Sequence, residues 1–334
     1  MMRSYLLKYF ALIVILTSTT FAFDVFKVIT PNKADVHDEN IMAVVVKVDT
    51  NVTDLLSITT DENLTYTMDI IGNKDYYCKN IPIHLGDNEI FIKAYQGDKL
   101  LKEYKQNVYY TSKVYKQFKY PPLKFEYNYF HKEKNEKECA KCHDMSVNET
   151  KGVAFEDVTK SNCYTCHKPI GYKKHAHAPT VNWLCTSCHN GKVGKYNRFD
   201  VNKSKYTVPD PIGGICLTCH KKTKKKWAQE RFKHEPVDSG RCNKCHNPHG
   251  SDEINYLRRP EFDLCTSCHK DKINGSHIIR TYSKKIHPVH GKKDPLRKGR
   301  ELSCVSCHEP HASNSSSFIK ADSVMGLCNK CHEK

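Results

Sequence analysis

The chain has 334 residues, with 53 Lys or Arg, 37 Asp or Glu and 17 Cys, and a formal net charge of +16. Its length indicates more than one domain, and the lack of a long apolar run after residue 22 excludes a polytopic membrane protein. The basic excess lies mainly in residues 119–334, with a net charge of +17, whereas residues 23–118 carry −3. The chain is therefore expected to have two parts of different chemistry.

Residues 1–22 are predicted to be a signal peptide. Arg3 and Lys8 supply the basic start, residues 10–17 form an apolar run, and residues 20–22 precede an expected cleavage site after Ala22. An uncleaved membrane anchor is the alternative, which the shortness of the apolar run disfavours. We therefore expect an exported protein, periplasmic or extracellular, with no transmembrane segment after cleavage.

Residues 23–112 predict a small β-sandwich domain. Runs rich in Val, Ile, Thr and Tyr alternate with turn signals at residues 31–32, 72–73, 86–88 and 97–98. The expected strands are residues 23–30, 41–48, 55–60, 64–71, 76–83, 89–95 and 100–110. Seven short strands in one segment are typical of a sandwich. Residues 85–92 resemble the late hairpin of bacterial immunoglobulin-like domains, which implies the architecture alone.

Cys78 is the one cysteine outside any short motif. In a predicted strand, a lone cysteine is usually a small buried apolar residue, and an intermolecular disulfide is the alternative. His37 and His84 are expected to be structural or at the surface.

Residues 113–130, which include Tyr120-Pro121-Pro122, are expected to form a stiff linker. Residues 131–334 then form a second domain in which Cys-x-x-Cys-His occurs eight times. The motifs are Cys139/Cys142/His143, Cys163/Cys166/His167, Cys185/Cys188/His189, Cys216/Cys219/His220, Cys242/Cys245/His246, Cys265/Cys268/His269, Cys304/Cys307/His308 and Cys328/Cys331/His332.

This motif predicts covalent attachment of haem c. Both thiols bond to the porphyrin, and the histidine is the proximal ligand of the iron. Zinc ribbons also use Cys-x-x-Cys pairs but need no histidine after the second cysteine. A disulfide framework is a weaker alternative, because sixteen of the 17 cysteines fall in this close spacing. We therefore expect eight haems c, each with iron.

With about 27 residues per haem, the second domain cannot build an ordinary apolar core. We expect the porphyrins to be the core, with loops and one- or two-turn helices beginning at each motif. The lysines would offset the haem propionates. The basic run at residues 221–226 is expected to be a solvated loop near propionates; docking of an acidic redox partner is the alternative, and nucleic acid is not expected.

Nine further histidines are candidate distal ligands of the irons: His131, His175, His177, His234, His249, His277, His287, His290 and His311. They recur in four units of two motifs each. A histidine stands eight residues before the first cysteine in three units, and two units continue as His246-Asn247-Pro248-His249 and His308-Glu309-Pro310-His311. With residues 232–237 upstream, this pattern resembles the doubled motif of multihaem cytochromes c, closely over residues 232–332 and more loosely over residues 131–220.

The resemblance implies respiratory or extracellular electron transfer along bis-histidine haems of low potential. A carrier without substrate chemistry of its own is therefore favoured, with other redox proteins or cytochromes as partners. Two alternatives stay open. One is an octahaem enzyme acting on nitrite, hydroxylamine or tetrathionate at one open haem, and the other is a subunit that polymerises into a filament.

Overall fold

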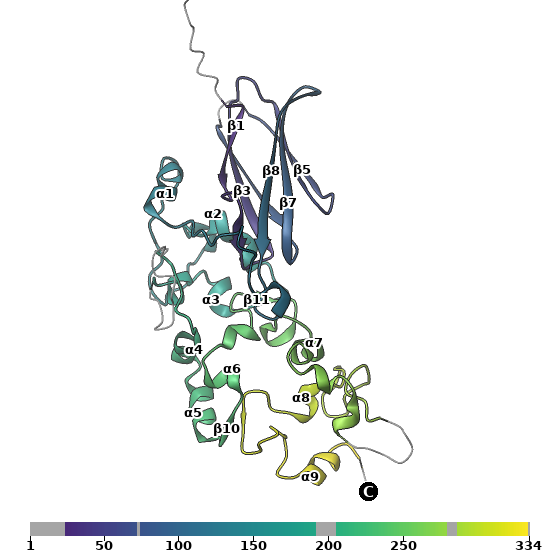
Figure 1. Ribbon diagram of the computed structural model, residues 1–334. Coiled ribbons are helices and arrows are strands. Elements are labelled where there is room, and N and C mark those ends of the chain that lie inside the picture. The colour runs from purple at the N-terminus through teal and green to yellow at the C-terminus, as the bar shows by residue number, and fades with distance from the viewer. Residues whose placement is uncertain (1–23, 72–73, 192–204, 279–285, 333–334) are drawn as a thin grey trace, which may run out of the picture.

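The computed structural model describes residues 24–71, 74–191, 205–278 and 286–332. A β-rich N-terminal part stands at one end, and a long part of short helices continues away from it in chain order (Figure 1). This arrangement confirms the expected fold class of N-terminal sheets followed by short helices, 3-10 turns and little regular structure. The predicted signal peptide lies outside the described residues.

Two sheets form the N-terminal part. The first has the order β1-β3-β6, and the second has the order β2-β8-β7-β4-β5. The strands are β1 (Phe26–Thr30), β2 (Asp35–His37), β3 (Ile41–Val48), β4 (Leu55–Thr60), β5 (Thr65–Asp69), β6 (Tyr76–Pro82), β7 (Gly86–Gln96) and β8 (Lys99–Tyr110). All neighbouring strands are antiparallel except β2 and β8, which run parallel.

Alternation of apolar residues along the strands builds the core between the sheets. Val44, Val46, Leu56, Ile58 and Ile92 are among its fully buried side chains. These residues lie in strands that the sequence predicted to within a few residues, because a half-buried strand leaves a period of two in its apolar positions.

Two details of the sandwich differ from expectation. Residues 86–88 were expected to break the chain but lie inside β7, where Gly86 has a φ of +99° and the buried side chain of Asn88 bonds to the His84 backbone. The side-chain amide of Asn88 holds the loop at His84 against the start of β7, so residues 86–88 form no separate turn. Strand β2 was not expected, because three residues with one apolar side chain give no period.

Cys78 also differs from expectation, since its side chain is exposed rather than buried. It lies in β6 between Tyr77, which is buried in the core, and Lys79. Successive side chains of a strand point to opposite faces, so the burial of Tyr77 turns Cys78 outward. His37, which was expected to be structural or at the surface, is partly enclosed, and burial lowers the pKa of its imidazole to about 4.

Residues 113–130 pack along the sandwich. Phe125 is buried against Val36 and Tyr109 in a second small core. The amide of Val36 donates to the Glu126 carbonyl at 3.0 Å, which continues the β2 edge. This contact fixes the direction in which the following residues leave the sandwich.

Short helices make up most of the regular structure after residue 112. The α-helices are α1 (Glu133–Cys139), α2 (Tyr164–His167), α3 (Ala178–Val181), α4 (Gly213–Cys219), α5 (Lys221–Gln229), α6 (Glu235–Asp238), α7 (Glu261–Thr266), α8 (Cys304–Cys307) and α9 (Val324–Cys328). The 3-10 turns are η1 (Lys116–Phe118), η2 (Val158–Lys160), η3 (Lys168–Gly171), η4 (Cys185–Ser187), η6 (Cys242–Lys244), η7 (Ile254–Tyr256), η8 (Lys270–Lys272) and η9 (Gly275–His277).

Two strand pairs of two residues each lie among these helices. Strand β9 (His175–Ala176) pairs with β11 (Gly250–Ser251), and β10 (Phe232–Lys233) pairs with β12 (Ala312–Ser313). Each pair joins segments that are far apart in the sequence. Within the described ranges, no helix has the length and apolar character needed to cross a membrane.

Candidate functional site: a line of paired histidines

Every Cys-x-x-Cys-His motif forms one helical turn. In all eight, the histidine amide donates to the carbonyl of the first cysteine at 2.8–3.0 Å. The turn brings both thiols and the imidazole to one side, as attachment to a single porphyrin requires. The expectation that a helical turn begins at each motif is right at Cys163, Cys185, Cys242 and Cys304. By contrast, α1, α4, α7 and α9 reach the motif at their C-terminal ends.

The two thiols of a motif are not equally enclosed by the polypeptide, which the sequence pattern did not predict. The first cysteine is half-buried in every motif, whereas the second is exposed in five of them: Cys142, Cys166, Cys219, Cys268 and Cys331. In the same five motifs the histidine is exposed as well.

Six motif histidines face another histidine from elsewhere in the chain. The ring centroids and interplanar angles are His131–His167 (5.9 Å, 36°), His177–His220 (6.3 Å, 11°), His189–His249 (5.9 Å, 7°), His234–His269 (6.0 Å, 27°), His246–His311 (6.0 Å, 10°) and His287–His332 (6.1 Å, 75°).

This separation fits one metal ion between the rings. A metal–imidazole bond of about 2.0 Å on each side and a ring radius of about 1.1 Å put the centroids of trans ligands about 6.2 Å apart. Imidazoles in direct stacking contact would be closer, and solvated ones would not hold one narrow distance six times. The six pairs therefore fit the axial positions of six haem irons.

The hydrogen bonds of the outer ring nitrogens support this arrangement. The Nδ1 atoms of His189 and His246 lie 2.9 and 2.7 Å from the carbonyls of Tyr206 and Asn255. A carbonyl only accepts, so Nδ1 carries the proton and Nε2 keeps its lone pair for a metal. His177 and His287 make the same bond to the carbonyls of Pro248 and Pro288.

Desolvation by the surrounding chain favours the neutral imidazole, the form that binds a metal, at five of these twelve histidines. It lowers the pKa of His167 to about 4, and the nearby His131, His189 and His249 lower it further. Burial is also the main reason why the pKa values of His177, His189, His234 and His246 are lowered.

The pairs follow one rule through the four units. The histidine upstream of each unit faces the second motif of its own unit, and the His-x-Pro-His histidine faces the first motif of the preceding unit. The rule names no partner for His143, because Asn190-Gly191 follow His189 where a second histidine would stand. Nor does the rule name a partner for His308, which lies in the last of the four units.

Six of the nine candidate distal histidines thus lie opposite a motif histidine. Across the described residues, His175, His277 and His290 face no motif histidine, and neither His143 nor His308 has a histidine ring opposite it. His277 and His290 are exposed, and His290 instead contacts Phe262 at a centroid distance of 4.2 Å.

Consecutive motifs are neighbours in space. A thiol–thiol hydrogen bond is the main reason for the raised pKa of Cys185, Cys216 and Cys265, whose partners are Cys163, Cys242 and Cys304. At the other junctions burial is the main cause and the next motif's thiol adds to it, in the pairs Cys139–Cys166, Cys188–Cys219, Cys245–Cys268 and Cys307–Cys331. The eight motifs therefore form a line in sequence order.

Three carboxylates next to this line were missed from the sequence. Glu136, Glu39 and Glu309 lie 3.0, 3.2 and 2.9 Å from the Nδ1 atoms of distal histidines. Glu309 stands inside the His-x-Pro-His motif and could have been found there, but Glu39 belongs to the sandwich and leaves no local signal. The ring of Trp227 stacks on that of His311 at a centroid distance of 4.8 Å.

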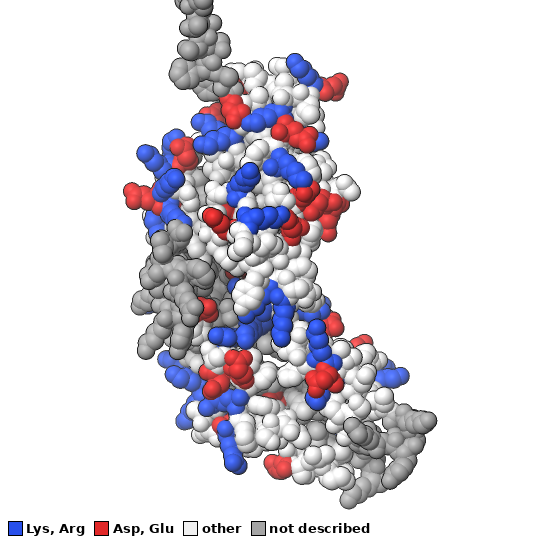
Figure 2. Space-filling view, in the orientation of Figure 1, with Lys and Arg blue, Asp and Glu red and all other residues white. Residues whose placement is uncertain are grey.

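Basic side chains surround the line. In Figure 2, Lys and Arg gather below the sandwich and along one edge of the helical part, while the sandwich carries both signs. The basic run at residues 221–226 lies in helix α5, which corrects the expected loop. Such side chains suit the neutralisation of propionates.

Comparisons with known proteins agree with these features. A family model described as the doubled CXXCH motif matches residues 234–274 and 294–334. The multiheme cytochrome MtrA of Shewanella baltica (strain OS185) is 27% identical over 190 residues, which are 51% of this chain and 52% of that protein. The chain thus spans about half the length of this curated relative.

Among solved structures, the fibronectin(III)-like modules of Clostridium thermocellum CbhA match 25% of this chain and 94% of theirs, at 12% identity and a TM-score of 0.21. The sulfur carrier protein SoxY of Chlorobium limicola f thiosulfatophilum matches 26% and 79%, at 15% identity and a TM-score of 0.22. Scores this low support no inference about fold or function. The doubled motifs and the similarity to MtrA support a multihaem c-type cytochrome, and CxxCH motifs indicate covalently bound haem c.

Proposed function

We propose that this protein is an exported octahaem c-type cytochrome that carries electrons along a line of haems, in respiratory or extracellular electron transfer. The observation that supports it most is the set of six histidine pairs spaced 5.9–6.3 Å apart. Two histidines per iron leave no position for a substrate, so these sites suit electron exchange rather than bond chemistry.

Haem c supplies the electron chemistry, because its iron alternates between the ferric and ferrous states. At six sites two histidines of the chain would hold the iron. The chain's own residues also fix the rings, through Nδ1 hydrogen bonds that bias each potential. The succession of thiol contacts puts neighbouring attachment sites close together in sequence order.

Export from the cytoplasm fits the predicted signal peptide and the covalent attachment of haem c. Redox proteins or other cytochromes are the proposed partners, meeting the line at its two ends. The sandwich stands beside the first motifs, where Tyr76 donates to Glu138 of α1 at 2.9 Å.

Electron paramagnetic resonance of the oxidised, haem-loaded protein tests the proposal, with the haem number fixed by intact mass. We expect a mass increase of eight haem groups and at least six low-spin haems. A preparation without haem, or with mainly high-spin iron, would contradict it.

A second candidate rests on His143 and His308, which face no histidine among the described residues. An open iron at either site would support an enzyme acting on a small nitrogen or sulfur compound. A histidine from a second copy at the same site would instead support polymerisation.

Carbon monoxide binding to the reduced protein separates these outcomes, because it needs an open or weakly ligated iron. If the protein is a carrier in which only the haems of His143 and His308 lack a second histidine, carbon monoxide binds at no more than two haems. Binding that falls as protein concentration rises identifies ligation between copies, and turnover of nitrite, hydroxylamine or tetrathionate identifies an enzyme.

A further inference from the structure

The outer nitrogens of the distal histidines meet two kinds of partner. His177 and His287 face backbone carbonyls at 2.9 Å, and a backbone bond to Pro310 serves His234. The other three face carboxylates: His131 faces Glu136, His249 faces Glu39 and His311 faces Glu309. The difference matters because a carboxylate carries a full negative charge and a carbonyl does not.

Of these carboxylates, Glu39 alone comes from the β-sandwich. It lies in the connection between β2 and β3, with its Oε1 atom 3.2 Å from Nδ1 of His249. Both side chains are mostly shielded, with exposed fractions of 31% for Glu39 and 25% for His249. A bond that crosses from one part of the molecule to the other is therefore partly protected from water, which strengthens it.

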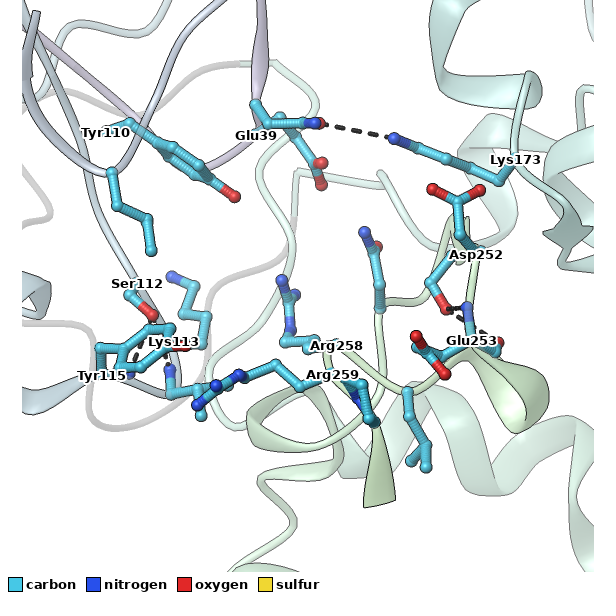
Figure 3. A pocket seen from close by; sticks show the side chains of 18 of the residues that line it. Glu39, Tyr110, Ser112, Lys113, Tyr115, Lys173, Asp252, Glu253, Arg258 and Arg259 are labelled. Atoms are coloured by element: carbon cyan, nitrogen blue, oxygen red, sulfur yellow. Dashed lines mark hydrogen bonds between the residues drawn. The ribbon is translucent and has the colours of Figure 1, made fainter. Parts of the chain in front are cut away.

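The surroundings hold Glu39 in place. It lines a cavity of about 320 Å³ between the sandwich and the helical part (Figure 3). The adjacent Asn40 accepts from Nζ of Lys173 at 3.4 Å, and the backbone amide of Lys174 donates to Asp252 at 3.1 Å. The first contact ties the β2–β3 connection to the segment before His177, and the second joins that segment to the one that follows His249.

A carboxylate that accepts the Nδ1 proton makes the imidazole a stronger electron donor. A stronger donor favours ferric over ferrous iron and so lowers the reduction potential. We propose that Glu39 is a positioning residue through which the β-sandwich lowers the potential of the haem held by His189 and His249. This inference rests on the proposed axial pairing.

The test is a potentiometric titration of the full-length, haem-loaded protein followed by absorption and electron paramagnetic resonance. Glu39→Gln keeps an acceptor oxygen but removes the charge. We expect the midpoint of one haem to rise, with roughly a tenfold change in its ferric–ferrous equilibrium constant, about 59 mV for one electron. The remaining midpoints should not move.

Glu253→Gln is the matched control. Glu253 lines the same cavity, so its loss removes the same charge without the bond to His249. Unchanged midpoints in Glu39→Gln, or an equal rise in Glu253→Gln, would overturn the proposal. If Glu39→Gln does not fold, Glu39→Asp withdraws the charge by one methylene and should raise the same midpoint less; no change there also overturns it.

The two proposals fail in different ways. If the wild-type protein contains no low-spin haem, that result alone contradicts the proposed function, before any variant is made. Low-spin haems whose midpoint potentials do not change in Glu39→Gln would contradict only the inference about Glu39. The affected haem is assigned by the low-spin signal that disappears in His249→Ala.

Discussion

The backbone amide of His234 donates to the carbonyl oxygen of His311 at 3.0 Å, although the two rings face different motif histidines, His269 and His246. His177 and His249 are joined in the same way at 3.3 Å. Each of the two short strand pairs thus holds the candidate distal histidines that face two successive motifs. Displacing one should disturb its neighbour.

We predict that His234→Ala converts one low-spin haem to high spin, because His269 would lose the ring opposite it. Electron paramagnetic resonance integrated against haem content measures the change. His277→Ala is the control, since His277 is exposed and faces no motif histidine in the described part of the chain. Equal effects of both variants would contradict the pairing.

Gly250 should not tolerate a side chain. Its φ is +121°, and a Cβ would lie 2.5 Å from the His175 carbonyl oxygen and 2.7 Å from Cα of Ala176. We expect Gly250→Ala to open the β9–β11 pair, at a cost of about 1–3 kcal/mol, and to weaken ligation by His249. Unfolding in urea and the low-spin signal measure both effects.

Gly214→Ala provides the comparison for this variant. Gly214 lies in α4, and a Cβ there meets nothing within 4 Å. Its substitution should leave ligation unchanged. A low-spin spectrum in Gly250→Ala indistinguishable from that of Gly214→Ala would show that the strand pair does not position His249.

The ring planes of the pairs predict two kinds of low-spin signal. Near-parallel imidazoles, as in His189–His249 at 7°, remove the degeneracy of two iron d orbitals, whereas the 75° angle of His287–His332 nearly preserves it. We expect one haem with a strongly axial signal beside rhombic ones. His287→Ala should abolish the axial signal alone; its persistence would assign it elsewhere.

The carboxyl group of Asp294 should make the free energy of unfolding depend on pH. Burial favours its neutral form, but hydrogen bonds from Ser306 and Arg297 outweigh burial and lower the pKa of the carboxyl to about 2. A lowered carboxyl pKa stabilises the folded state above the unfolded value near pH 4, and this contribution is lost as pH falls toward 2. We expect Asp294→Asn to lower the free energy of unfolding by roughly 2–4 kcal/mol at neutral pH.

Urea unfolding from pH 7 to pH 2 measures this contribution. The difference between wild type and Asp294→Asn should shrink below pH 4. Asp271→Asn is the control, because Asp271 is exposed and pairs with Lys272 at the surface. If the difference in the free energy of unfolding between wild type and Asp294→Asn stays constant with pH, the Asp294 carboxylate is not its source.

The sequence alone predicted the β-sandwich and the haem motifs because both depend on short-range order. Apolar residues at every second position mark strands such as β3, and attachment of haem needs only one helical turn from Cys to His. It also predicted nine distal candidates, since few other residues could face so many irons.

Only the tertiary structure paired His249 with His189 and His311 with His246. Each pair joins two different units, and the short strand pairs beside them form between segments that are far apart in the sequence. The tertiary structure also brought Glu39 next to His249, which follows it by 210 residues in the sequence. A histidine's local sequence fixes its chemistry, but its partner depends on packing between distant segments, which no local spacing records.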